Sequence, residues 1–130
     1  MIDFTKVLPA VRFAIGGGAW ALPEQTGALF GINFRDNHDT IYMGRLFGVR
    51  DFALGLGPLA STGSGRRLWW QIGIACDAFD AAAGLLWLRK GAPKRAGILV
   101  TATALAAVGM GAAALAAEES DPVSGSPASR

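Results

Sequence analysis

Hydrophobic residues are concentrated in four long segments that are separated by short polar stretches. The segments cover residues 4–22, 41–61, 68–88 and 97–117, and the last of them contains no ionisable residue. A helix of about twenty residues, rising roughly 1.5 Å per residue, is as long as the hydrocarbon core of a bilayer is thick. The pattern predicts an all-α protein that forms a four-helix transmembrane bundle.

The connections between these segments are polar or rich in glycine and proline. Pro23 ends the first segment, because proline cannot continue a helix without losing a hydrogen bond. Residues 27–34 are apolar but too short to span, and predict an interfacial helix or turn. Residues 35–39 and 61–67 predict loops, and residues 89–95 predict a tight basic turn. Four spans place both chain ends on one side.

The predicted domain organisation is a single four-span transmembrane domain over residues 1–117 and a tail over residues 118–130. The tail is polar and rich in proline and serine, a composition typical of disorder. The first segment carries Arg12 within its apolar part and predicts a retained helix rather than a cleaved signal peptide. The basic residues of the 89–95 turn favour a cytoplasmic location for that turn.

Composition supports a membrane location and narrows the chemistry. Of the 130 residues 52% are hydrophobic and 17% are charged, against about 25% charged in an average soluble domain. The net charge of +2 comes from short basic clusters beside apolar runs, which indicates membrane topology signals and not a nucleic-acid surface. We therefore expect an integral membrane protein, in the bacterial plasma membrane, with the lipid bilayer as its partner. A soluble alanine-rich helical bundle is the alternative.

Metal and disulfide chemistry are not expected. Cys76 is the single cysteine, which excludes an intrachain disulfide and a cysteine-based metal site. His38 and Asp39 lie in a predicted exposed loop, and one histidine with nearby aspartates lacks the ligand number that zinc requires. No metal and no cofactor are predicted.

The second segment combines glycines with charged residues. Gly44, Gly48, Asp51 and Gly55 recur at helical spacing and share one face, which would let a neighbouring helix approach closely. Arg45 and Arg50 point in other directions on the same helix. The alternative for Arg45, which lies about one turn from the helix start, is extension of its charged group to the membrane interface. A charge at mid-membrane depth costs roughly 2.5–3.5 kcal/mol on insertion scales unless it is compensated. This helix is therefore expected at the centre of the bundle.

The third segment supplies two further carboxylates. Asp77 and Asp80 are three residues apart and lie on one helical face, which Gly73 and Gly84 extend. Packing this face against the second segment predicts a polar Arg/Asp cluster between helices 2 and 3, made of Arg45, Arg50, Asp51, Asp77 and Asp80. Two arginines against three aspartates leave a formal charge of −1, so one carboxyl group is expected to hold a proton.

Arg12 and the tryptophans are expected at the membrane boundaries. Arg12 is near enough to a helix end to extend its charged head group to the interface, and a role in a site is the alternative. Trp69, Trp70 and Trp87 bracket the third segment, as residues of an interfacial belt do. Lining of a substrate cavity is the alternative role for these rings.

Two stretches of the sequence carry a resemblance to a known family. Residues Arg45 to Gly55 contain the pattern Arg-x-x-Gly-x-Arg-Asp, and residues Cys76 to Asp80 contain the pattern Asp-x-x-Asp. The chain resembles a family of small four-helix integral membrane proteins, common in actinobacteria and also found in fungi, over roughly residues 7–115. The resemblance implies a four-helix fold. The family has no settled activity, so it implies no catalytic roles.

Three functional hypotheses follow from these residues. The first is a structural or accessory membrane component, stabilised by the Arg/Asp network or binding a membrane-protein partner. The second is a membrane-embedded enzyme of isomerase or cyclase type that acts on a lipophilic substrate. In it Asp77 or Asp80 would be the general acid, Asp51 is a further catalytic candidate, and Arg45 or Arg50 would hold an anionic group. The third is a small proton-coupled transporter.

A cavity distinguishes the first two hypotheses. An enzyme requires one of some hundreds of cubic ångströms that opens onto the aspartates. A structural network requires paired carboxylates and no cavity. The sequence leaves open the substrate, the partner, the membrane orientation and whether the chain forms a homo-oligomer.

Overall fold

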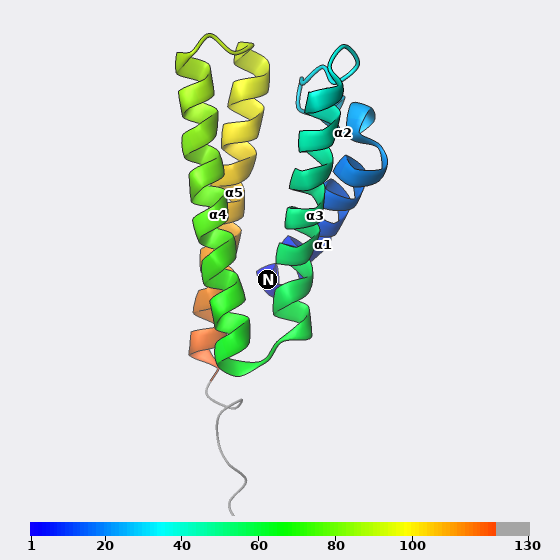
Figure 1. Cartoon of the computed structure of the whole chain (residues 1–130). Helices are drawn as coiled ribbons and strands as arrows, with labels where there is room; N and C mark the ends of the chain where they lie inside the picture. Colours follow the sequence, from blue (N-terminus) through cyan, green and yellow to red (C-terminus); the bar gives the residue numbers. More distant parts are fainter. Residues whose placement is uncertain (122–130) are drawn as a thin grey trace, which may run out of the picture.

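The structure, a computed structural model, describes residues 1–121 and is all-α within that range. Four long helices and one short helix follow one another along the chain: α1 (Phe4–Ala21), α2 (Pro23–Leu29), α3 (His38–Ala60), α4 (Gly63–Arg89) and α5 (Lys94–Ser120). The predicted fold class is thus confirmed at the level of helix content. The four long helices alternate in direction (Figure 1).

The long helices are arranged as two pairs. α1 packs mainly on α3 and α4 mainly on α5, while the contact between the pairs is less extensive. Figure 1 shows the pairs joined closely at the end where α3 passes into α4, and further apart at the end that carries α2 and the α4–α5 turn. This divergence leaves room between the pairs, at the level of the charged side chains described below.

Three helix ends differ from the predicted boundaries, and at one of them a polar side chain caps the helix. Asn37 accepts a hydrogen bond from the Asp39 amide and begins α3 inside the predicted 35–39 loop. α4 begins at Gly63, within the predicted 61–67 loop. α5 continues to Ser120, past the predicted end of the domain at residue 117. The remainder of the predicted tail, residues 122–130, lies outside the described residues.

Ion pairs hold the ends of the helices together where α3, α4 and α5 meet. Arg66 Nη1 lies 3.2 Å from Glu118 Oε1, and Arg67 Nη2 lies 2.9 Å from Glu119 Oε1. Arg66 Nε also donates to the carbonyl oxygens of Pro58 and Ser61, both at 2.9 Å. These bonds satisfy carbonyl groups at the C-terminal end of α3, where a helix leaves them without a backbone partner.

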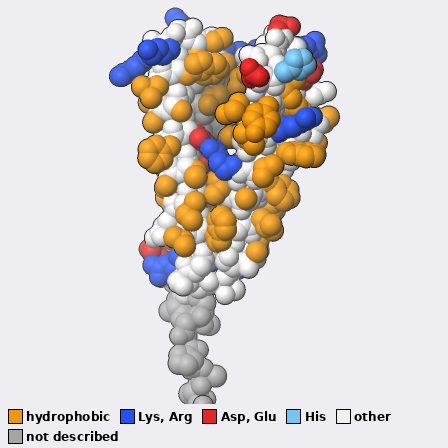
Figure 2. Space-filling model, viewed as in Figure 1, with side chains coloured by type: hydrophobic (Ala, Val, Ile, Leu, Met, Phe, Trp, Pro, Cys, Tyr) orange, Lys and Arg blue, Asp and Glu red, His pale blue; other side chains and the backbone are white. Residues whose placement is uncertain are grey.

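Small residues form much of the interior, and large apolar residues cover the outside. Many of the buried positions of the four long helices are glycine or alanine, among them Gly16, Ala19, Gly44, Gly48, Gly55, Gly73, Ala81, Gly84, Ala96, Ala104, Gly111 and Ala114. Large hydrophobic side chains are exposed on every long helix, for example Trp20, Leu46, Phe79 and Leu105. In Figure 2 orange side chains cover the middle of the molecule and most charged side chains lie toward its two ends.

Two helices, α4 and α5, are long and apolar enough to cross a membrane, judged by length and composition. α1 carries Lys6 and Arg12, and α3 carries Asp39, Arg45, Arg50 and Asp51, and these charges lower the hydropathy of both helices. Length and composition therefore do not confirm the predicted four-helix transmembrane bundle, and membrane crossing by α1 and α3 stays a prediction.

The tryptophans do not all lie where a belt would have them. Trp20 is exposed, and Trp87 is 38% exposed. Trp70 is only 3% exposed and packs in a cluster with Leu8 and Ala114. The belt prediction is wrong for Trp70, because this face of α4 is turned toward α1 and α5.

Candidate functional site

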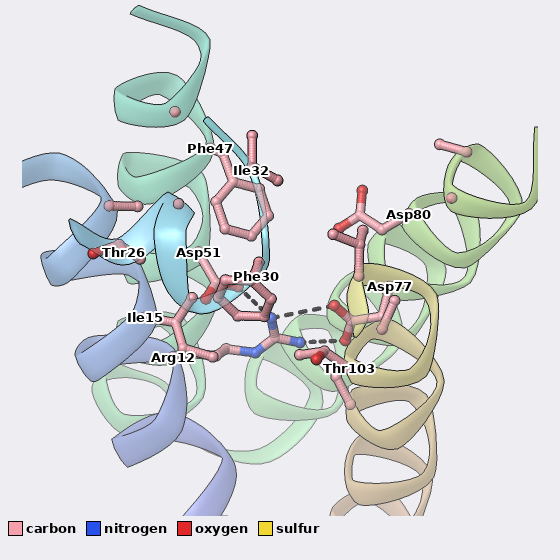
Figure 3. Close-up of a pocket in the computed structure, with 18 of the residues that line it drawn as sticks. Arg12, Ile15, Thr26, Phe30, Ile32, Phe47, Asp51, Asp77, Asp80 and Thr103 are labelled. Carbon is pink, nitrogen blue, oxygen red and sulfur yellow. Dashed lines mark hydrogen bonds and ion pairs between the residues drawn. The ribbon is translucent and has the colours of Figure 1, made fainter. Parts of the chain in front are cut away.

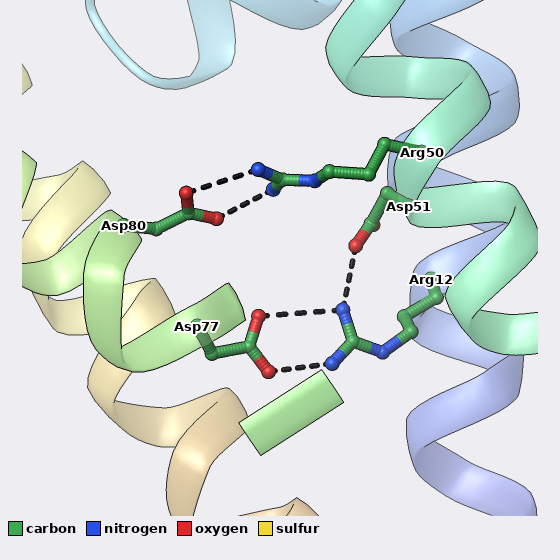
Figure 4. A network of polar contacts seen from close by, with 5 residues as sticks. All are labelled: Arg12, Arg50, Asp51, Asp77 and Asp80. Carbon is green, nitrogen blue, oxygen red and sulfur yellow. Dashed lines mark hydrogen bonds and ion pairs between the residues drawn. The ribbon is translucent and has the colours of Figure 1, made fainter. Parts of the chain in front are cut away.

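Arg12 lies at the centre of a buried ion-pair network that joins three helices. Its Nη1 donates to Asp51 Oδ1 at 2.6 Å, and its Nη2 donates to Asp77 Oδ2 at 2.5 Å. A longer contact of 3.4 Å runs from Nη1 to Asp77 Oδ1. The three side chains are between 5% and 7% exposed. Figure 4 shows the guanidinium of α1 placed between a carboxylate of α3 and one of α4.

Arg50 and Asp80 form a second pair beside the first. Arg50 Nη1 and Nη2 donate to the two Asp80 oxygens at 3.1 and 2.5 Å, a two-bond geometry that suits a planar guanidinium. Arg50 also lies over the Phe47 ring, 4.8 Å from its centre. The two side chains are 38% and 28% exposed. This pair is thus more accessible than the Arg12 network.

Glycines make room for the Arg12 side chain. A Cβ atom added to Gly55 of α3 would lie 3.1 Å from Arg12 Cβ, and one added to Gly73 of α4 would lie 3.2 Å from Arg12 Nη2. Both distances are shorter than an ordinary contact. Gly55 and Gly73 thus lie against an arginine of α1. The predicted packing of the two glycine-bearing faces on each other is wrong, because Gly48 of α3 meets Gly16 of α1 and Gly84 of α4 meets Thr101 of α5.

The structure brings together four of the five residues of the predicted cluster. Arg50, Asp51, Asp77 and Asp80 lie within it, as Figure 4 shows. Arg45 does not: it is exposed, and its Nε donates to the Trp20 carbonyl oxygen at 3.2 Å. The prediction that Arg45 belongs to the network is wrong. Gly44 and Gly48 lie on the buried face of α3, whereas Arg45 lies on its exposed surface.

Arg12 takes the place that the sequence assigned to Arg45. The expectation that Arg12 extends to the interface is wrong, since Arg12 is 4% exposed. One signal in the sequence points to its burial. Leu8, Arg12, Gly16 and Ala19 recur at helical spacing and are all buried in the structure. This face has the same combination of a charge and small residues as the Asp51 face of α3.

A cavity of about 910 Å³ adjoins the network between the two helix pairs. Four charged residues border it: Arg12, Asp51, Asp77 and Asp80. The rest of the wall is largely apolar, with Phe30, Phe34, Phe47 and Trp87 among the aromatic residues. Figure 3 shows the Asp80 and Asp77 carboxylates on one side of the space, the rings of Phe30 and Phe47 on the other, and the Arg12 guanidinium below.

The arrangement permits binding and proton transfer but offers little for metals. An aspartate at the wall of an apolar cavity can accept hydrogen bonds from a ligand when it is ionised, and can give the ligand a proton when it is protonated. Among the described residues, no group of three or more histidine, cysteine, aspartate or glutamate side chains is arranged to hold a metal ion. Each aspartate of the cluster is instead paired with an arginine.

The chain was compared with protein-family models, with curated proteins and with solved structures, and none of the three comparisons gave a match. The resemblance to a four-helix membrane family stays a prediction. The functional argument therefore depends on the cavity and the charge network themselves.

Proposed function

We propose that this chain is an integral membrane protein that binds a lipophilic molecule in the cavity between its two helix pairs. The observation that carries the proposal is the cavity of about 910 Å³, whose apolar wall ends on the Arg12 network. A volume of several hundred cubic ångströms with a few polar groups is typical of small-molecule sites. A purely structural network would need the paired charges but no cavity beside them.

Exposure of large apolar side chains supports the membrane part of the proposal. Soluble monomers rarely expose contiguous apolar patches larger than a few hundred Å², whereas apolar side chains cover the middle of this molecule (Figure 2). Small residues at helix contacts are also typical of membrane bundles, where close backbone approach replaces burial of large side chains. We infer that all four long helices cross the bilayer, and that this bilayer is the plasma membrane.

The charges of α1 and α3 are compatible with that arrangement. Arg12 and Asp51 lie inside the bundle and are paired, so they would not meet lipid. Arg50 is half-buried, and its partner Asp80 lies across the gap between the pairs. Compensation of this kind is what an ionisable residue at membrane depth requires.

A variant that fills the cavity tests the proposal. Thr103 of α5 lines the cavity (Figure 3), whereas the neighbouring Ala102 is exposed and lies outside the lining. The protein would be purified from membranes in a mild detergent, and the lipophilic molecules that accompany it would be extracted and measured by mass spectrometry. We expect Thr103→Phe to lose a lipophilic component that the unaltered protein and Ala102→Phe both retain.

Folding of each variant is checked by circular dichroism and by elution as a single species. The proposal fails if folded Thr103→Phe retains the same components in the same amounts as Ala102→Phe. It also fails if the unaltered protein, purified from membranes, carries no lipophilic component above the level of bulk lipid.

Catalysis is the second candidate function, because the three candidate catalytic aspartates all border the cavity. An isomerisation or cyclisation of a bound lipophile would need one of them to give up a proton. Asp80 is the best placed for this role, since it is more accessible than Asp51 and Asp77. No feature of the described residues separates proton-coupled transport from simple binding, so transport is not proposed.

A further inference from the structure

The charge network is one positive charge short. Asp51, Asp77 and Asp80 contribute three negative charges, and Arg12 and Arg50 contribute two positive ones. An uncompensated charge away from water is costly, so a buried network tends to be completed by a proton or a counter-ion. The cavity is the space from which such a group would reach these carboxylates.

We propose, on the basis of the ligand-binding function argued above, that the cavity binds a lipophilic amine in its ammonium form. The ammonium group would complete the network to three positive and three negative charges. Its hydrocarbon part would occupy the apolar wall. Lipophilic anions are disfavoured by the same charge balance.

The positions of the charged groups at the cavity support a cation. Three of the four charged residues that border it are aspartates, and the fourth, Arg12, is already bonded to two of them. Arg50 pairs with Asp80 but is not part of the cavity wall. A ligand in the cavity therefore meets carboxylates more readily than it meets a free guanidinium.

Asp51 offers a specific acceptor. Its Oδ1 accepts the bond from Arg12, whereas Oδ2 accepts no hydrogen bond from the described residues. Asp51 borders the cavity and is only 5% exposed. An ammonium group that donates to Oδ2 would form a charge-assisted bond in a poorly hydrated place, where such bonds are strongest.

Aromatic rings at the cavity wall also favour a cationic ligand over an anionic one. Phe30 lines the cavity on the side facing Asp77 (Figure 3), and Trp87 lines it from α4, whereas the Phe47 ring already lies beside the Arg50 guanidinium. The face of an aromatic ring attracts a cation within about 6 Å and attracts a carboxylate not at all. The same rings also pack well against a hydrocarbon chain.

Three photoreactive probes test the inference. They share one dodecyl chain that carries a diazirine, and they end in an ammonium, a hydroxyl or a carboxylate group. The purified full chain is placed in phosphatidylcholine nanodiscs at neutral pH, each probe is brought to the same concentration in the bilayer, and the labelled peptides are identified by mass spectrometry. We expect the ammonium probe to label cavity-lining residues about tenfold more than the carboxylate probe does, since one favourable charge contact supplies a factor of that order.

The outcomes separate the two proposals. If no probe labels the cavity, lipophile binding itself is wrong and the ammonium inference falls with it. If the hydroxyl or the carboxylate probe labels the cavity as strongly as the ammonium probe, the cavity binds lipophiles and only the ammonium inference is overturned. That second result would indicate that a proton completes the network.

Two variants that shift the charge in opposite directions keep the test independent of folding defects. Asp80→Asn removes the excess negative charge, so the preference for ammonium over carboxylate is expected to fall about tenfold. Arg50→Gln increases the excess and is expected to preserve or raise that preference. Asp39→Asn, at an exposed position outside the lining, serves as the control. A fall in the preference in both variants would contradict the inference.

Discussion

At the scale of single residues, the decisive feature is an arginine on the buried face of the first helix. Arg12 is bonded to Asp51 and Asp77 and is almost completely buried. A buried charge loses its hydration, and only close partners of opposite charge compensate for this loss. The three residues are therefore interdependent, and removal of one leaves the others without compensation.

Substitution of Arg12 is expected to be far more damaging than substitution of Arg45. Arg12→Gln leaves two buried carboxylates without their guanidinium and is expected to lower the free energy of unfolding by about 3–5 kcal/mol. Arg45→Gln, at an exposed position, is expected to change it by less than about 0.5 kcal/mol. Unfolding of the purified variants in detergent micelles measures both values. Equal losses would contradict the central position of Arg12.

The two aspartates of α4 are expected to differ although they lie on one helical face. Asp77 is buried and accepts two bonds from Arg12, so Asp77→Asn is expected to cost about 1.5–3 kcal/mol of unfolding free energy, as charged hydrogen bonds do. Asp80 is partly exposed, and an accessible ion pair contributes about 1 kcal/mol or less.

Accumulation in membranes and unfolding in micelles check this difference. Asp80→Asn should accumulate like the unaltered protein, which makes it the suitable variant for tests of ligand binding or activity. If Asp80→Asn is as destabilised as Asp77→Asn, the Arg50–Asp80 pair is primarily structural and a role for Asp80 in chemistry loses its support.

At the scale of helices, glycines decide which faces meet. Gly16 of α1 and Gly48 of α3 lie opposite one another at the crossing of these helices. A Cβ atom added to Gly16 would lie 2.7 Å from the Gly48 carbonyl oxygen and 2.8 Å from the Phe52 amide nitrogen. Both neighbours are backbone atoms that cannot move aside by a change of rotamer. The crossing holds Arg12 and Asp51 within bonding distance.

Two adjacent glycines provide a matched pair of substitutions. Gly16→Ala forces the helices apart and is expected to cost about 1–3 kcal/mol, the usual range for overpacking. Gly17 has no atom within 4 Å of its added Cβ, so Gly17→Ala is expected to stabilise the protein by up to about 1 kcal/mol through higher helix propensity. Unfolding in micelles gives the sign of each change, and a loss at Gly17 similar to that at Gly16 would contradict the assigned crossing.

At the scale of the whole molecule, the distribution of side chains is the reverse of that in a soluble protein. Glycine and alanine pack the interior, large apolar residues lie outside, and charged residues gather at the ends and in one internal network. The ends are marked by the Arg66–Glu118 and Arg67–Glu119 pairs on one side and by the basic 89–95 turn on the other. A bilayer between these ends would cover the apolar surface.

Labelling from outside the cell tests this topology. In a Cys76→Ser background, single cysteines would be introduced as Ser64→Cys, at the start of α4, and Lys90→Cys, in the basic turn, both at exposed positions. We expect a membrane-impermeant maleimide to label Ser64→Cys in intact cells and Lys90→Cys only after permeabilisation, because basic turns are retained in the cytoplasm. Labelling of both from one side would exclude a membrane between the two ends.

The hydrophobic pattern by itself determined the helix content, the four long helices and most of the candidate site. Helical spacing was sufficient to place Asp51 with Gly44, Gly48 and Gly55 on one buried face, because that periodicity is local and does not depend on the partner. The same reasoning placed Asp77 and Asp80 toward α3, which is correct for Asp80, bonded to Arg50, and wrong for Asp77, whose partner Arg12 belongs to α1. The predicted cluster also has the same formal charge of −1 as the observed network, although it includes Arg45 in place of Arg12.

Only the tertiary structure decided which arginine completes the network and that a cavity lies beside it. Arg12 and Arg45 each lie within an apolar segment. The small residues that share the Arg12 face indicate its burial, but they do not show which helices and carboxylates it meets. That choice depends on how α1 crosses α3 at Gly16 and Gly48, a contact between distant parts of the chain. The cavity likewise results from the divergence of the two helix pairs. Packing angles of this kind depend on all the side chains at an interface, and no single periodic pattern records them.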